Sequence, residues 1–195
     1  MRFLFRSSIV TCLTLIAGMA SAVGQFGVPL NRSDPNLEPA QIRELVARYC
    51  RTDFAGARLN PADWPKLQPV VSWKSNPDFP VFAVTSRFDV DPALIAEHGK
   101  YTVNVRYRLL GTFNLTEGYS DESFGRVDYV VFIVGEVNGD WRIADVQPGH
   151  PHVSKAAALQ WINAKMAATQ DPVTKTLYQR AIDVLDKQNA SPFAK

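Results

Sequence analysis

The chain has only two cysteines, almost no net charge and no long hydrophobic run, and each shortage excludes a class of protein. Cys12 lies in a leader that we expect to be removed, so the mature chain keeps only Cys50 and has no internal disulfide. Arg2 and Arg6 account for the whole excess of 21 basic over 19 acidic residues. A neutral mature chain is not expected to bind nucleic acid or an anionic membrane surface.

The leader has the three parts of a secretory signal peptide. Two arginines precede an apolar run over 9–17, and the small residues Ala20-Ser21-Ala22 follow it. A membrane-spanning helix needs about 20 apolar residues, so this run is too short for a stable anchor. We predict cleavage near Ala22 and a periplasmic or secreted protein. Its expected parts are a signal peptide at 1–22, a flexible lead-in at 23–38, a single domain at 39–188 and a tail at 189–195.

Motifs of nucleophilic and phosphate chemistry are also missing. The sequence has no G-x-S-x-G motif and no glycine-rich phosphate loop. Cys50 falls on the apolar face of a helix predicted to begin near Pro39, which favours a small core residue over a reactive thiol. We therefore expect no cofactor.

The middle of the chain predicts an antiparallel sheet. Residues 82–90 and 101–109 alternate between apolar and polar, as half-buried strands do. Residues 129–134 are apolar at nearly every position, which predicts a central strand covered on both faces. The proline-rich segment 60–78 predicts short helical turns in a packed loop.

Asn138-Gly139 predicts a two-residue hairpin, because both residues accept positive φ angles. The hairpin register places Val134 opposite Ile143 and Phe132 opposite Asp145. Asp145 then shares one face of the sheet with these apolar side chains, an unusual place for a carboxylate.

After residue 152 the apolar spacing becomes helical again. Ser154 and Asp171 are the expected N-caps of two final helices. Their apolar stripes predict an antiparallel pair that docks on the sheet or on a partner protein.

The segment Val130-Val-Phe-Ile-Val-Gly-Glu-Val-Asn-Gly-Asp-Trp-Arg-Ile-Ala-Asp145 resembles the NTF2-like (cystatin-like α+β) superfamily, and the likeness is strongest over 101–146. The resemblance implies an α+β fold with an N-terminal helix packed on a curved antiparallel sheet, forming a cone with an apolar cavity. The two C-terminal helices would be additions to that fold. The superfamily includes isomerase-like enzymes, dehydratases and non-catalytic binding or assembly domains.

An isomerase of this kind needs a carboxylate base and a nearby proton donor that face the cavity. Asp145 and Asp128 are the candidate acids, and Tyr107 and Tyr129 are the candidate donors. The competing interpretation is that Asp128 pairs with an arginine on the solvent face and that Asp145 caps a loop.

His150 and His152 are weak candidates for metal ligands, with Asp145 nearby. Two histidines at this spacing lack a firm third ligand, so no metal is predicted.

The function expected from the sequence is binding without catalysis. The ligand would be a small apolar molecule or a partner protein, and the expected cavity residues are Phe132, Val134, Trp141 and Ile143. The first alternative is an isomerase- or dehydratase-like enzyme that uses Asp145 as its base. The second is an assembly module that forms a homodimer through the open face of its sheet.

Overall fold

The computed structural model describes residues 37–121 and 126–188. The predicted signal peptide, most of the lead-in and the tail lie outside these residues. The described elements are α1 (Leu37–Phe54), η1 (Pro61–Lys66), η2 (Gln68–Val70), β1 (Val81–Val90), β2 (Leu94–Ile95), η3 (Glu97–Gly99), β3 (Tyr101–Asn114), β4 (Gly118–Ser120), β5 (Val127–Val137), β6 (Asp140–Gln147), β7 (His152–Ser154), α2 (Lys155–Ala168) and α3 (Pro172–Lys187). None of the helices described is long and apolar enough to span a membrane.

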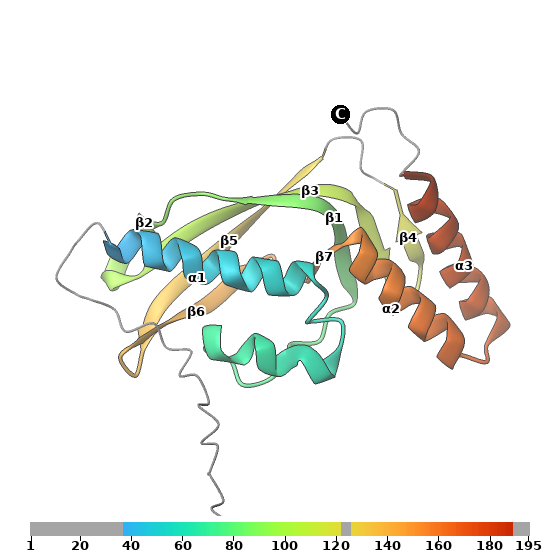
Figure 1. Ribbon diagram of the computed structural model, residues 1–195, viewed down its shortest axis with the longest axis horizontal. Helices are drawn as coiled ribbons and strands as arrows, with labels where there is room; N and C mark the ends of the chain where they lie inside the picture. Colours follow the sequence, from blue (N-terminus) through green and yellow to red (C-terminus); the bar gives the residue numbers. More distant parts are fainter. Residues whose placement is uncertain (1–36, 122–125, 189–195) are drawn as a thin grey trace, which may run out of the picture.

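The strands form a strongly curled, mixed sheet with the order β6-β5-β3-β1-β7, shaped like half a barrel (Figure 1). The short strands β2 and β4 pair with β3. The α+β class and the curved sheet are confirmed. The expectation of a purely antiparallel sheet is wrong, because β7 pairs with β1 in parallel. With only three residues, β7 is too short to produce an alternating pattern in the sequence.

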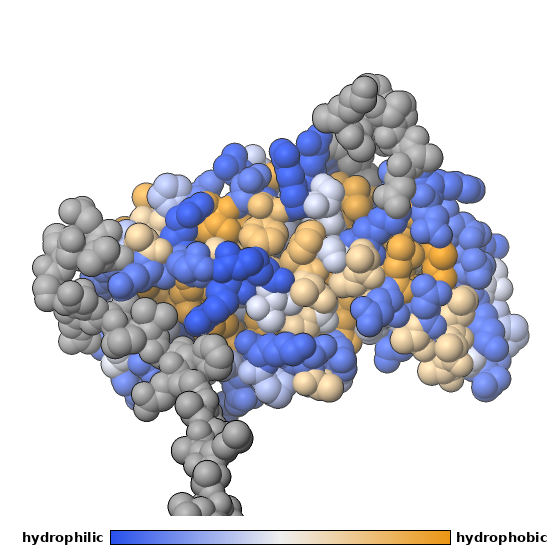
Figure 2. Space-filling view, viewed as in Figure 1, coloured by the Kyte–Doolittle hydropathy of each residue, from blue (hydrophilic) through white to orange (hydrophobic). Residues whose placement is uncertain are grey.

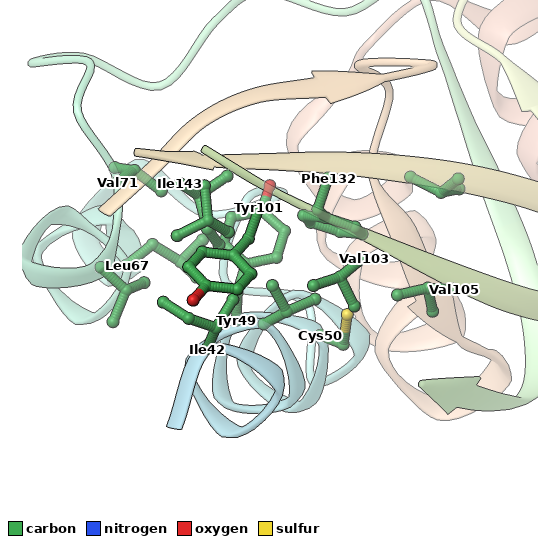
Figure 3. Packing of buried hydrophobic residues seen from close by; sticks show 14 of the residues in the cluster. Ile42, Tyr49, Cys50, Leu67, Val71, Tyr101, Val103, Val105, Phe132 and Ile143 are labelled. Atoms are coloured by element: carbon green, nitrogen blue, oxygen red, sulfur yellow. The ribbon is translucent and has the colours of Figure 1, made fainter. Parts of the chain in front are cut away.

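Helix α1 lies across one face of the curled sheet and forms one half of the core. Its residues Ile42, Val46, Tyr49 and Cys50 recur every three or four positions and are buried. Figure 3 shows Tyr49 and Cys50 pointing from α1 toward the strands. The rings of Tyr49 and Phe132 meet edge to face at 5.4 Å. The short helical turns η1 and η2 close one end of this core, as the proline-rich segment predicted.

The C-terminal helices cover a second group of core residues at the other end of the sheet. Ser154 accepts a hydrogen bond from the backbone N–H of Ala157 at 3.1 Å, and Asp171 caps α3, so both predicted N-caps are confirmed. Trp161 packs on Phe82 and donates from Nε1 to the Leu59 carbonyl at 3.1 Å. Figure 2 shows mostly hydrophilic residues along the outer edge of the helical pair.

The β5–β6 hairpin follows the predicted register only near its turn. Asn138 and Gly139 have φ angles of 55° and 87°, and Val134 lies opposite Ile143 as expected. A bulge follows, because Ile133 pairs with Asp145 instead of with Ala144. One extra residue on β6 turns every later side chain to the other face. Asp145 is therefore exposed, and the partly buried Val146 lies opposite Phe132, in the place predicted for Asp145.

The outer face of β5 is open to solvent. Tyr129 is 64% exposed and Val127 is 39% exposed, while Val131 and Ile133 are partly exposed. The prediction that residues 129–134 are covered on both faces is therefore wrong. The inner face is covered as expected, since Val130, Phe132 and Val134 are buried.

Candidate metal centre

The candidate site lies where β5 begins, beside β7. Asp128 is two residues before the buried Val130 and shares its inward direction, because alternate residues of a strand face the same side. Tyr107 lies directly opposite Asp128 on β3 and is 1% exposed. Asp128 itself is partly exposed, so one side of the site reaches solvent.

Asp128 is joined there by two histidines. Its Oδ2 is 2.9 Å from Nε2 of His152 and 3.7 Å from Nε2 of His150. Each of the three residues offers one ligand atom, and these atoms all lie within 4.8 Å of one another. His150 comes from the loop between β6 and β7, and His152 is the first residue of β7. Two segments separated in the sequence, the start of β5 and the turn into β7, thus converge on one point.

The His152 ring is held firmly. Its side chain is 2% exposed, its ring stacks on Tyr107 at a centroid distance of 4.2 Å, and the His150 ring stacks on it at 4.6 Å. Its Nδ1 is 3.2 Å from the His150 carbonyl oxygen. A hydrogen bond from Nδ1–H to a backbone carbonyl is the arrangement that orients metal-binding histidines through Nε2.

The two contacts of the His152 ring are both with acceptors, but a neutral imidazole has only one N–H. The contacts are satisfied by a doubly protonated, charged ring. Both contacts are also satisfied by a neutral ring that donates from Nδ1 while a cation binds both Nε2 and the Asp128 carboxylate. Burial lowers the pKa of His152, although Asp128 opposes this effect, so burial disfavours the charged ring.

The pKa values of the two acids near the centre are shifted in opposite directions. Hydrogen bonding from His150 and His152 holds the pKa of Asp128 well below its usual range. Asp53, at the end of α1, accepts a hydrogen bond at Oδ2 from the backbone N–H of His152 at 3.0 Å. Burial raises the pKa of Asp53 to about 6, although Arg58 and the His152 amide oppose this effect.

The structure corrects several of the predicted site residues. Asp145 is on the outer surface, where its carboxylate accepts hydrogen bonds from the Val146 backbone and from Gln147, because the bulge in β6 turns it away. Tyr129 is likewise on the outer face. Asp128 meets His150 and His152 rather than an arginine, and it supplies the third candidate ligand that the sequence did not locate.

Three of the four residues expected to line a cavity are core residues. Phe132, Val134 and Ile143 are at most 1% exposed and belong to the core under α1 (Figure 3). Trp141 is partly buried and packs edge to face on Tyr101 at 5.4 Å. These four residues pack against other side chains of the protein and do not line an open cavity.

Sequence reasoning missed Asp53. Its position in α1, four residues after Tyr49 and three after Cys50, places it on the buried face of the helix. A carboxylate on the apolar face of the helix was the signal in the sequence that could have identified Asp53. It is 2% exposed, and its Oδ1 has no hydrogen-bond partner among the residues described.

Comparisons with known proteins add no identity: no family model, curated protein or solved structure matches this chain.

Proposed function

We propose that this protein binds one divalent transition-metal ion, such as zinc, through Asp128, His150 and His152. The observation that supports this most is the pair of acceptors around the buried His152 ring, which a cation at Nε2 would satisfy. Zinc bonds of about 2.0–2.1 Å in a tetrahedral site place ligand atoms about 3.3 Å apart. The separations of 2.9 and 3.7 Å lie on either side of that value.

The proposed function is binding, as expected from the sequence, with a metal ion in place of an apolar ligand. The expected catalytic base, Asp145, lies outside the curled sheet, so it offers no support for the isomerase alternative. We propose in addition that the domain is NTF2-like, since its sheet curls around a helix, and that it is exported, since residues 1–22 have a leader pattern.

Equilibrium dialysis of the metal-stripped mature chain against zinc tests the proposal. We expect one equivalent of bound zinc and a loss of affinity of at least about 100-fold in His150→Gln, because a direct ligand should cost more than the outer partners that are worth tenfold to 100-fold. His98→Gln is the matched control, since the side chain of His98 is 86% exposed on a distant turn. Equal affinities of the two variants would contradict the proposal.

A further inference from the structure

Resting on the proposed metal site, we infer that Asp53 is a positioning residue of the centre. It holds the His152 backbone in place and adds a buried negative charge to that of the partly exposed Asp128.

The contacts of the peptide bond before His152 support the first role. The carbonyl of Pro151 accepts a hydrogen bond from the Ala83 N–H at 2.8 Å, and the N–H of His152 donates to Asp53 at 3.0 Å. This peptide is therefore fixed from both sides, by β1 and by α1. A ligand whose backbone and ring are both fixed needs no reorganisation when it binds an ion.

The charge of Asp53 has no direct ion-pair partner. Arg58 is buried and is the cation acting on it, but the Arg58 guanidinium donates to Asn76 at 3.2 Å and to the Tyr49 hydroxyl at 3.4 Å. Within the described residues Asp53 forms no ion pair within 4.0 Å, and its Oδ1 is unpartnered. A buried carboxylate without a direct ion pair costs stability, which Arg58 and the His152 N–H offset only in part.

A divalent ion at the proposed site would add a favourable interaction with this charge. Asp53 and Asp128 carry two negative charges beside two histidines that are neutral when they bind metal. The ion would attract both carboxylates, beyond what the buried Arg58 supplies to Asp53, in a region where electrostatic interactions are stronger than in water. Asp53 touches the centre only through the His152 amide, so it acts on the ion through its charge and through His152.

The test measures zinc affinity and the stability of the metal-free protein in Asp53→Asn, with Asp145→Asn as the exposed control. Asn keeps an acceptor for the His152 N–H and removes the charge. We expect zinc affinity to fall about 10- to 100-fold and the melting temperature of the metal-free protein to stay equal or rise. A purely structural role would lower both quantities together. Unchanged zinc affinity in Asp53→Asn, or a joint fall of both quantities, would overturn the inference.

A measurement on the wild-type chain covers the case in which the variant does not fold. Loading with paramagnetic Co²⁺ should shift or broaden the ¹³C carboxyl resonance of Asp53, while that of Asp145 should stay unchanged. An undisturbed Asp53 resonance in Co²⁺-loaded protein overturns the inference and leaves the metal site standing. Absence of any metal binding by the wild type overturns both.

Discussion

Asp128 and Asp145 lie on neighbouring strands and have the same parity in the simplest hairpin register, yet they occupy opposite faces of the sheet. Asp128 faces inward, meets two histidines and has a strongly lowered pKa. Asp145 faces solvent, and its carboxylate accepts hydrogen bonds from the neighbouring residues Val146 and Gln147. The difference arises from one extra residue in β6. The bulge, and not the residues next to Asp145 in the sequence, decides which face Asp145 occupies.

A carboxylate on the inward face of β6 should cost far more stability than Asp145 does on the outer face. Because of the bulge, Val146 lies opposite Phe132, so Val146→Asp places an acid against the core. Burial of this unpaired carboxylate should lower the free energy of unfolding by about 3 kcal/mol. Urea denaturation of the variant measures the loss. Val146→Leu is the apolar control, and equal stabilities of the two variants would show that this position of β6 does not face the core.

Asp53 allows a pH test of the buried corner against the exposed hairpin. Its folded pKa of about 6 is above the value of 3.8 expected when unfolded, so ionisation of Asp53 opposes folding. The contribution of neutral Asp53 to the free energy of unfolding of the wild type is complete below pH 3.8 and is lost as pH rises through 6. The loss corresponds to about 3 kcal/mol.

The measurement is the unfolding free energy of metal-free wild type and Asp53→Asn between pH 4 and 8. The advantage of Asp53→Asn should grow through this window and level off above pH 6. Asp145→Asn is the exposed control for an Asp-to-Asn change elsewhere in the sheet. A constant difference across the window would mean that Asp53 does not titrate as its burial implies.

The two acids should differ equally clearly in metal binding. Asp128→Asn removes a direct ligand, and we expect zinc affinity to fall at least about 100-fold, or about 2.7 kcal/mol. Asp145→Asn should bind zinc like the wild type. Isothermal titration calorimetry of both variants decides this, and a loss at Asp145 alone would place the centre at the hairpin instead.

Local signals in the sequence predicted local structure well. Helix α1 followed from its apolar spacing, the caps Ser154 and Asp171 from their side chains, and the hairpin turn from Asn138-Gly139. Each of these depends on residues within one or two turns of chain. The α+β class followed from their order along the chain.

The site depended on distant contacts that no local pattern reveals. Asp128 meets His152 across 24 residues, and His152 meets Asp53 across 99. The three-residue strand β7 places His152, and the bulge at Ala144 turns Asp145 outward, and neither leaves a periodic signal. The histidines were noted from the sequence with Asp145 nearby, but without the fold no firm third ligand could be named, and Asp128 was not placed beside them.

The two tyrosine candidates repeat the comparison on a smaller scale. Tyr107 is buried beside Cys50 and under His152, whereas Tyr129 is exposed. Tyr107→Phe leaves the ring stacked on His152 but removes a buried hydroxyl that interacts with Cys50, so the unfolding free energy should fall by about 1 kcal/mol. Tyr129→Phe should change it by less than about 0.5 kcal/mol. Chemical denaturation of both variants measures these effects, and equal losses would show that the faces of the sheet differ less in stability than their burial implies.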